Sequence, residues 1–451
     1  SLLVCEGGRK AALMVKIMNF IVIFILFTLF KLIYTFFLHR MIDKQRQLPL
    51  PECVSDVYNP ERYQTFLDYS SDTRKLSYIF LILTTILEFG LIFAGFYKWV
   101  DVISHGNEYL VVLYSTVLVL LFSCPIDYLH EYLQTFKIEE KYHQNKKTKK
   151  EFNKDFLLEF PMYIASILLT FLFIAIVHFI AKANFYPMSI YKALLIAVII
   201  VCIVLVALFF ITLLSLLIMR KTYTFTEMED NELRQKITGL LKGVKKKIYH
   251  IYIYNESKKS ISKNAFVLHL LFYREISIAD NFITENAEDE LLGVIAHEVG
   301  HLKHKKTLLE YLSYSLLVCL FCVLTYCIYN PQLLIQFVSW VNASFGITTT
   351  NYNLLVTAIS TFMTPILFLF SLFSNYISRK NEYEADVNAV KEGYGEALIK
   401  TFKELSHDEL IDVNPCKWVE ITKYNHPGMV NRINAIYNEE KKFKEEKTYG
   451  K

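Results

Sequence analysis

Seven long apolar runs alternate with polar segments along the chain, near residues 17–38, 76–99, 108–124, 156–181, 190–219, 308–329 and 354–377. Most of them meet or approach the ~20 residues that an α-helix needs to cross a hydrocarbon core of ~30 Å. The composition agrees, because 53% of the residues are hydrophobic and 15% are aromatic, more than a soluble globular domain usually carries. We therefore expect an all-α polytopic membrane protein with seven transmembrane helices.

Two hydrophilic blocks interrupt this pattern, from residue 220 to about 306 and from 378 to 451. They divide the chain into an N-terminal membrane region with five transmembrane helices, residues 1–219, and a second region with two further helices, residues 220–451. The second region ends in a hydrophilic C-terminal segment.

Short elements are expected inside the first hydrophilic block. The acidic stretch that follows Phe225 reads as the first turn of a helix. Alternating residues predict one strand over 248–254, and a second strand is expected over 265–269. Together the strands predict a small β-hairpin beside the helix that follows. Such a hairpin either binds an extended substrate by strand addition or is purely structural.

Lysine and arginine are distributed unevenly between the connections. The loops around 39–75 and 125–155 are rich in them, whereas the loops around 100–107 and 330–353 contain neither residue. By the positive-inside rule the basic loops face the cytoplasm, together with the C-terminus. The net charge of +4 reports this topology and contact with anionic lipid, and no nucleic-acid partner is expected.

The segment His297-Glu298-Val299-Gly300-His301 carries the most specific chemistry in the chain. Histidines four residues apart lie on one face of a helix, so their ring nitrogens can converge on one metal ion at about 2.0–2.1 Å. Glu298 then falls beside a metal-bound water, where it can act as a general base. This is the arrangement of a zinc peptidase. The alternative is a chance pattern in an exposed charged helix.

A catalytic zinc site needs a third protein ligand and an open position for water. Glu382 is the expected ligand, because the helix that leaves the last apolar run would return it to the side of His297 and His301. Asp386 lies one turn further on, where it could accept the free N–H of a ligand histidine and fix its tautomer. Taken alone, this segment would more often be a charged helix end in solvent.

Further segments complete a resemblance that runs along nearly the whole chain. They are Phe66, Tyr69 and Lys75 in the first basic loop, Phe136–Lys141, Asn145–Thr148, Ser262–Phe266 and the segment from His426 to Arg432. With the metal motif and the seven spans, they resemble the type I CAAX prenyl endopeptidases, integral-membrane zinc metalloproteases related to the HtpX heat-shock proteases.

The resemblance implies roles for the remaining site residues. One Zn²⁺ per chain would be held by His297, His301 and Glu382, and Glu298 would move the proton of the attacking water. His426 and Arg432 would donate to the developing oxyanion, or Arg432 would position His426 to do so. Asn264 would hold the substrate backbone, and the transmembrane helices would surround an intramembrane chamber.

The implied function is removal of the C-terminal tripeptide, aaX, from prenylated CAAX proteins. The implied partners are a prenylated or membrane-associated protein or peptide and membrane lipid. The active site would face the cytoplasm, in the endoplasmic reticulum membrane of a eukaryote or the cytoplasmic membrane of a bacterium. Two alternatives are an HtpX-like quality-control protease, a group with about four spans, and a catalytically inactive scaffold, which would have no need of Glu298.

Overall fold

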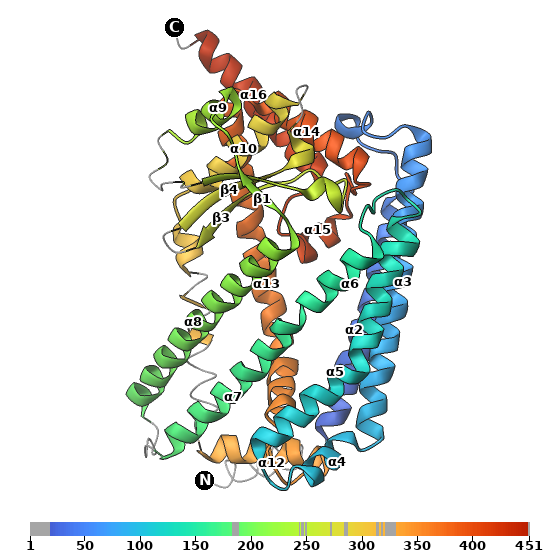
Figure 1. The fold of residues 1–451 in the computed structure, drawn as a ribbon, viewed down its shortest axis with the longest axis vertical. Helices are drawn as coiled ribbons and strands as arrows, with labels where there is room; N and C mark the ends of the chain where they lie inside the picture. The colour runs from blue at the N-terminus through green and yellow to red at the C-terminus, as the bar shows by residue number, and fades with distance from the viewer. Residues whose placement is uncertain are drawn as a thin grey trace, which may run out of the picture.

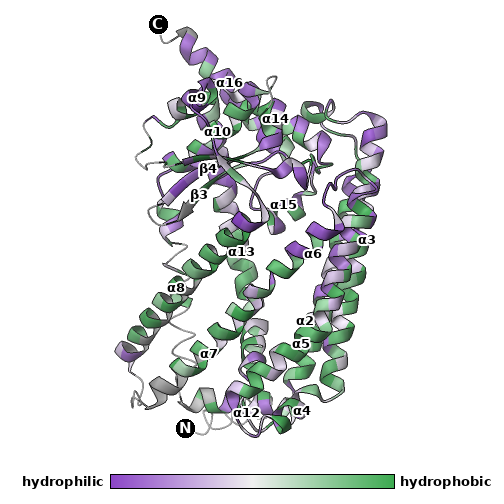
Figure 2. Ribbon diagram, in the orientation of Figure 1, coloured by the Kyte–Doolittle hydropathy of each residue, from purple (hydrophilic) through white to green (hydrophobic). Residues whose placement is uncertain are grey.

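The computed structural model describes residues 19–449 apart from 183–188, 243, 245–247, 249, 271–272, 284–286, 313–314, 317–318 and 321–330. Long helices fill one end of the molecule, and a smaller region of short helices and a sheet lies at the opposite end (Figure 1). Hydrophobic residues dominate the long helices, whereas hydrophilic residues gather in the covering region (Figure 2). This division matches a membrane part that is covered at one end by a hydrophilic region.

Five described helical segments are long and apolar enough to cross a membrane. They are α2 (Phe20–Gln45), α3 (Pro60–Phe93), α5 (Glu108–Leu133) with the π-helical η2 (Gln134–Glu139), α6 (Lys149–Leu158) with α7 (Phe160–Lys182), and α13 (Tyr352–Lys391). The 33-residue α8 (Ile190–Thr222) covers the fifth expected run. The sixth run, 308–329, lies partly outside the described residues. The protein is a multi-pass membrane protein, and the count of seven spans stays a prediction.

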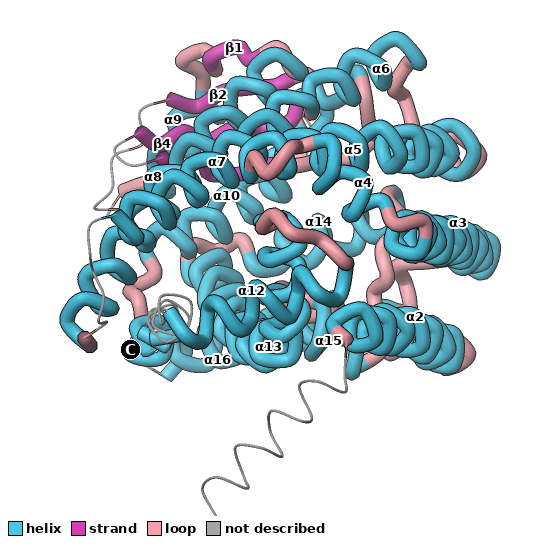
Figure 3. The backbone as a smooth tube through the Cα atoms, turned by 90° about the horizontal axis from the view of Figure 1, so that it is seen from below, coloured by secondary structure: helices cyan, strands magenta, loops and turns pink. Residues whose placement is uncertain are grey.

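The transmembrane helices contact one another in sequence. α2 contacts α3, α3 contacts α5, α5 contacts α7 and α7 contacts α8, while α13 contacts α2, α5 and α7. Seen from below, the helices from α2 to α8 form a curved row, and α13 lies between the two ends of this row (Figure 3). Only 6–22% of each candidate span is buried inside the structure, so these helices touch one another sparingly. The intramembrane chamber implied by the resemblance remains a prediction.

Asparagine N-caps set the start of several long helices. In each case the side-chain oxygen accepts a backbone N–H of the first turn, which would otherwise lack a partner. The capping residues are Asn19 for α2, Asn59 for α3, Asn107 for α5 and Asn351 for α13. At the far end of the bundle, short helices α4 (Phe96–Ile103) and α12 (Pro331–Phe345) join the spans.

A four-stranded sheet takes the place of the expected hairpin. Its order is β1 (Phe225–Glu227), β2 (His250–Tyr254), β4 (Tyr273–Ala279) and β3 (Ala265–Leu270). Both expected strands exist, but they do not pair with each other, because β4 lies between them, parallel to β2 and antiparallel to β3. The pairing predicted from the sequence is therefore wrong. β4 is buried from Glu275 to Ala279, which favours the centre of the sheet.

The helix expected after Phe225 begins later than predicted. Residues Phe225–Glu227 form β1, and α9 (Glu232–Leu240) starts only after Asn231, whose side chain accepts from the Arg234 N–H. The cap, and not the acidic residues before it, marks the start of this helix.

The main hydrophobic core lies between the sheet and the helices of the hydrophilic region. These helices are α9, α10 (Glu288–Lys303), the end of α13, α14 (Gly395–Asp408) and α16 (Met429–Tyr449). Short α15 (Lys417–Lys423) lies nearer the membrane part. The central helix is α10, which contacts α9, α13, α14 and β3. A helix held on so many sides gives its side chains fixed positions.

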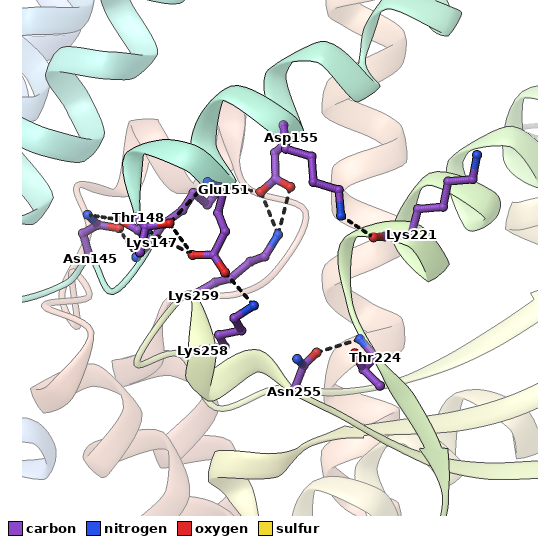
Figure 4. Close-up of polar contacts among 11 residues, drawn as sticks. Asn145, Lys147, Thr148, Glu151, Asp155, Lys221, Thr224, Asn255, Lys258 and Lys259 are labelled. Atoms are coloured by element: carbon purple, nitrogen blue, oxygen red, sulfur yellow. Dashed lines mark hydrogen bonds and ion pairs between the residues drawn. The ribbon is translucent and has the colours of Figure 1, made fainter.

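A group of ion pairs ties the membrane part to the sheet (Figure 4). The chain before α6 runs beside the β2–β3 connection, with an isolated bridge between Asn145 and Ser260. The buried Lys259 ammonium lies 2.8 and 2.9 Å from the two carboxylate oxygens of Asp155. Lys258 pairs with Glu151 at 2.7 Å. The start of the fourth span is thereby fixed against the segment that leads into β3.

Candidate metal centre

The two histidines of the motif project from the most enclosed part of α10. Nearly every residue from Glu290 to Gly300 is buried, because the sheet, α13 and α14 pack around this helix. The ring centroids of His297 and His301 lie 4.8 Å apart. The sequence thus places two imidazoles side by side, as the four-residue spacing requires.

Glu382 reaches the same point from α13. Its carboxylate oxygens lie 3.5 Å from Nε2 of His297 and 3.3 Å from Nε2 of His301. Tetrahedral ligands bound at about 2.05 Å from an ion are themselves about 3.3 Å apart, so this spacing fits one ion held by all three. Oε2 of Glu382 is buried and makes no hydrogen bond with the described residues, which is an orphaned acceptor that a cation would satisfy. His297, His301 and Glu382 can therefore hold a metal ion.

A close helix crossing brings these ligands together. Gly300 faces α13, and a Cβ atom built on it would lie 2.7 Å from Cα of Ala385. Asn388 strengthens the crossing by donating to the Ala296 carbonyl at 2.7 Å. Glycine in the motif is therefore needed for the approach of α10 to the Glu382 helix.

Gly300→Ala should lower both stability and metal affinity. The added methyl group forces α10 away from α13, and overpacking of this kind costs about 1–3 kcal/mol. Gly239→Ala, on α9, is the matched control, because a Cβ there meets nothing within 4 Å. Thermal unfolding and metal content would be measured for both variants in detergent. Equal behaviour of the two variants would contradict the close crossing.

A buried ionic network supports His297 from behind. Asp386 Oδ1 lies 2.9 Å from Nδ1 of His297, the contact expected from the sequence. Arg432, on α16, donates to both Asp386 oxygens, from Nε at 3.0 Å and from Nη2 at 2.6 Å. Its Nη1 lies 3.5 Å from Glu382. Burial alone would lower the pKa of His297, but contact with Asp386 and Glu382 raises it to about 9, so a metal ion must displace a proton from this ring.

Asp386→Asn should weaken metal binding by about 10–100-fold, because the ligand histidine loses the carboxylate that fixes its tautomer and raises its basicity. Affinity would be measured by competition with a chelator of known strength. Glu392→Gln, on the exposed end of the same helix, removes an equal charge and should leave affinity unchanged. Unchanged affinity in Asp386→Asn would show that the contact does not tune the ligand.

Glu298 and His426 are the two further candidate catalytic side chains near the ligands. Burial raises the pKa of the Glu298 carboxyl, which makes it a stronger base than an exposed glutamate. His426 is more than half exposed, and its Nε2 lies 3.4 Å from Oε1 of Glu382. The structure therefore brings His426 from the C-terminal motif to the metal ligands, with a face left open to solvent.

Asn264 lies exposed immediately before β3, and its backbone carbonyl accepts from the Ala279 N–H at 2.8 Å. β3 is an outer strand of the sheet and contacts α10. The predicted substrate-binding residue is thus at the start of the edge strand beside the metal helix. Its role in binding stays a prediction.

A second polar network around His304, beyond the C-terminal end of α10, was not predicted from the sequence. His304 lies between two carboxylates, with Nδ1 2.8 Å from Glu384 and Nε2 3.0 Å from Glu310. Asn381, next to Glu382, donates to Glu310 at 3.3 Å. Burial would lower the pKa of His304, but the two carboxylates raise it. The only sequence signal was a histidine three residues after the second ligand, where the helix has already ended.

Two family models match separate parts of the chain. Residues 227–440 match the model of peptidase family M48, and residues 38–219 match the model described as CAAX prenyl protease N-terminal, five membrane helices. The first match contains all three candidate ligands, and the second contains the second to fifth expected spans.

Curated relatives align with most of the chain. A CAAX prenyl protease 1 homolog of Arabidopsis thaliana is 25% identical over 89% of this chain and 94% of its own length. A CAAX prenyl protease 1 homolog of Dictyostelium discoideum is 28% identical over 93% of this chain and 97% of its own length. The crystal structure of S. mikatae Ste24p aligns with a TM-score of 0.77 at 22% identity, over 93% of this chain and 99% of that one. The fold is the same as that of Ste24p.

Proposed function

The chain belongs to peptidase family M48 and carries the membrane region of the CAAX prenyl proteases, and we propose that it removes the C-terminal tripeptide from prenylated CAAX proteins. One observation carries this proposal. A His297–His301–Glu382 cluster with Glu298 beside it lies in a catalytic region that is joined directly to transmembrane helices. A soluble peptide substrate would require no such attachment.

We propose Zn²⁺ as the metal. Two imidazole nitrogens and one carboxylate oxygen form the donor set of many catalytic zinc sites. When bound, Zn²⁺ supplies Lewis acidity, which acidifies a water molecule and polarises the scissile carbonyl.

The remaining steps belong to side chains of the protein. Glu298 takes a proton from the attacking water and passes it to the leaving amine. His426, with its exposed ring beside Glu382, donates a hydrogen bond to the oxygen of the scissile carbonyl as negative charge develops there. Asn264 and the edge of β3 hold the extended substrate backbone by strand addition.

For Arg432 we propose a role other than donating a hydrogen bond to the oxyanion. Its guanidinium is 8% exposed, and its polar contacts are with Asp386, His297 and Glu382. We propose it as a positioning residue that neutralises Asp386 and orients the ligand pair.

Membrane attachment follows from the chemistry of this substrate. An isoprenoid chain partitions into the bilayer at ~0.8 kcal/mol per buried CH₂, so its protease must place the metal near the membrane surface. The positive-inside pattern favours a catalytic region on the cytoplasmic side. In a eukaryotic cell the endoplasmic reticulum is the proposed location.

The test compares a farnesylated CAAX peptide with its unprenylated twin. We expect kcat/KM to be higher for the farnesylated peptide, and we expect a zinc chelator to abolish both reactions. Equal kcat/KM for the two peptides would favour an HtpX-like quality-control protease. No cleavage of either peptide by the metal-loaded protein would favour the inactive scaffold.

A further inference from the structure

The ends of α2 and α3 nearest the catalytic region form a cavity of mixed polar and apolar lining together with the segment that contains α15. Its volume is about 380 Å³, within the usual range for ligand sites. Polar and charged side chains on its wall include His39, Arg46, Ser70, Arg74, Asp412 and Lys423. None of these residues belongs to the metal centre.

Positive charge is in excess on this wall. Arg46, Arg74 and Lys423 face a single lining carboxylate, Asp412, which pairs with Arg46 Nη2 at 2.9 Å. Arg74 pairs with Asp43, which lies outside the lining and is half exposed. Three cationic side chains thus face two carboxylates, Asp412 and Asp43, which leaves one positive charge in excess.

Arg46 has unused hydrogen-bonding capacity. Its side chain is nine-tenths buried, yet Nε and Nη1 make no hydrogen bond with the described residues. Buried donors of this kind normally have partners. Its guanidinium is 4.7 Å from the ring centroid of Phe66, so the aromatic ring covers a face and not the N–H edges. Ser70 accepts from Arg74 Nη1 at 3.1 Å, which leaves its hydroxyl hydrogen free for another acceptor.

These features indicate an anionic group with several acceptor oxygens. A phosphate matches the planar fork of arginine and can accept from lysine and serine at the same time. The location indicates how that phosphate is presented. α2 is a candidate span, and it exposes Phe30, Ile33 and Phe37 on the apolar turns that precede the cavity.

We propose that this cavity binds the phosphate headgroup of an anionic phospholipid, whose acyl chains lie along the exposed apolar face of α2. Basic pockets between transmembrane helices bind such headgroups in other membrane proteins. The site joins both N-terminal spans to residues 412–424, which lead into His426. It is independent of the peptidase activity proposed above, and its test does not use proteolysis.

Native mass spectrometry of the purified protein tests the proposal. In detergent, dioleoyl phosphatidylglycerol should bind at one site per chain and more tightly than dioleoyl phosphatidylcholine. Arg74→Gln/Lys423→Gln should weaken phosphatidylglycerol binding by roughly 30-fold, the effect of two cations near a lipid headgroup. Lys44→Gln/Lys75→Gln removes two cations that lie on α2 and α3 but outside the cavity lining, and it should leave binding unchanged.

Two further arms keep the result interpretable. The single variant Lys423→Gln changes only an exposed side chain, so its expected loss of about fivefold does not depend on refolding of the cavity. Inorganic phosphate at millimolar concentration should not displace the lipid. Equal lipid affinity in the two double variants would overturn the proposal, and full displacement by phosphate would replace the lipid with a soluble anion.

Discussion

Glu298→Gln should lower kcat for peptide cleavage by about 10²–10⁴-fold without loss of the metal. Glutamine keeps the size of the side chain and cannot accept the proton of the attacking water. The two histidine ligands lie one residue before and three residues after it on α10, so their positions should not change. Single-turnover kinetics on the farnesylated peptide would measure the chemical step, and metal analysis of the same sample would establish occupancy.

Glu288→Gln is the control for this substitution. Glu288 lies in the first turn of the same helix and pairs with Lys236, away from the ligands. It should retain full activity. If Glu298→Gln retained wild-type kcat with the metal bound, Glu298 would not be the general base and the proposed mechanism would be wrong.

Arg432→Met should destabilise the protein by about 3–5 kcal/mol, because it leaves the Asp386 carboxylate buried without its cation. Asp386 is 1% exposed, and Arg432 supplies two of its hydrogen bonds while its guanidinium lies 4.2 Å from the Phe402 ring centroid. Methionine replaces the packing volume and not the charge. Denaturant unfolding in detergent, followed by far-UV circular dichroism, would measure the change.

Lys444→Met provides the comparison on the same helix. Lys444 pairs with Glu396, and both side chains are largely exposed, so the pair should contribute no more than about 1 kcal/mol. A similar loss in both variants would mean that Arg432 stabilises α16 generally and does not compensate Asp386. The ionic support assigned to the metal ligand would then have to be abandoned.

The metal motif could be predicted from sequence because its geometry is local. His297, Glu298 and His301 lie within one helix, so helical periodicity alone fixes which side chains share a face. Glu382 required one further step, the continuation of a transmembrane helix into the catalytic region. The structure places it within 3.5 Å of both histidines.

Contacts between distant segments could not be predicted in this way. Arg432 meets Asp386 only because α16 packs against α13, and nothing within either segment specifies that packing. The lipid cavity depends equally on α2, α3 and residues 412–424 meeting in space.

The central strand was missed for a different reason. β4 contains Arg274 and Glu275, which suggest an exposed segment, yet Glu275 is fully buried. Arg220, at the end of α8, pairs with the Glu275 carboxylate. A buried charge that is neutralised by a residue 55 positions away is invisible to periodicity.

The most direct test of the account is the identity of the product. The purified protein would be incubated with a farnesylated CAAX peptide, and mass spectrometry would identify the fragments. We expect the intact C-terminal tripeptide and a farnesylated peptide that ends in cysteine, both absent after chelation and restored by added Zn²⁺. Cleavage at other bonds, or release of the tripeptide that persists without metal, would contradict a zinc CAAX endopeptidase.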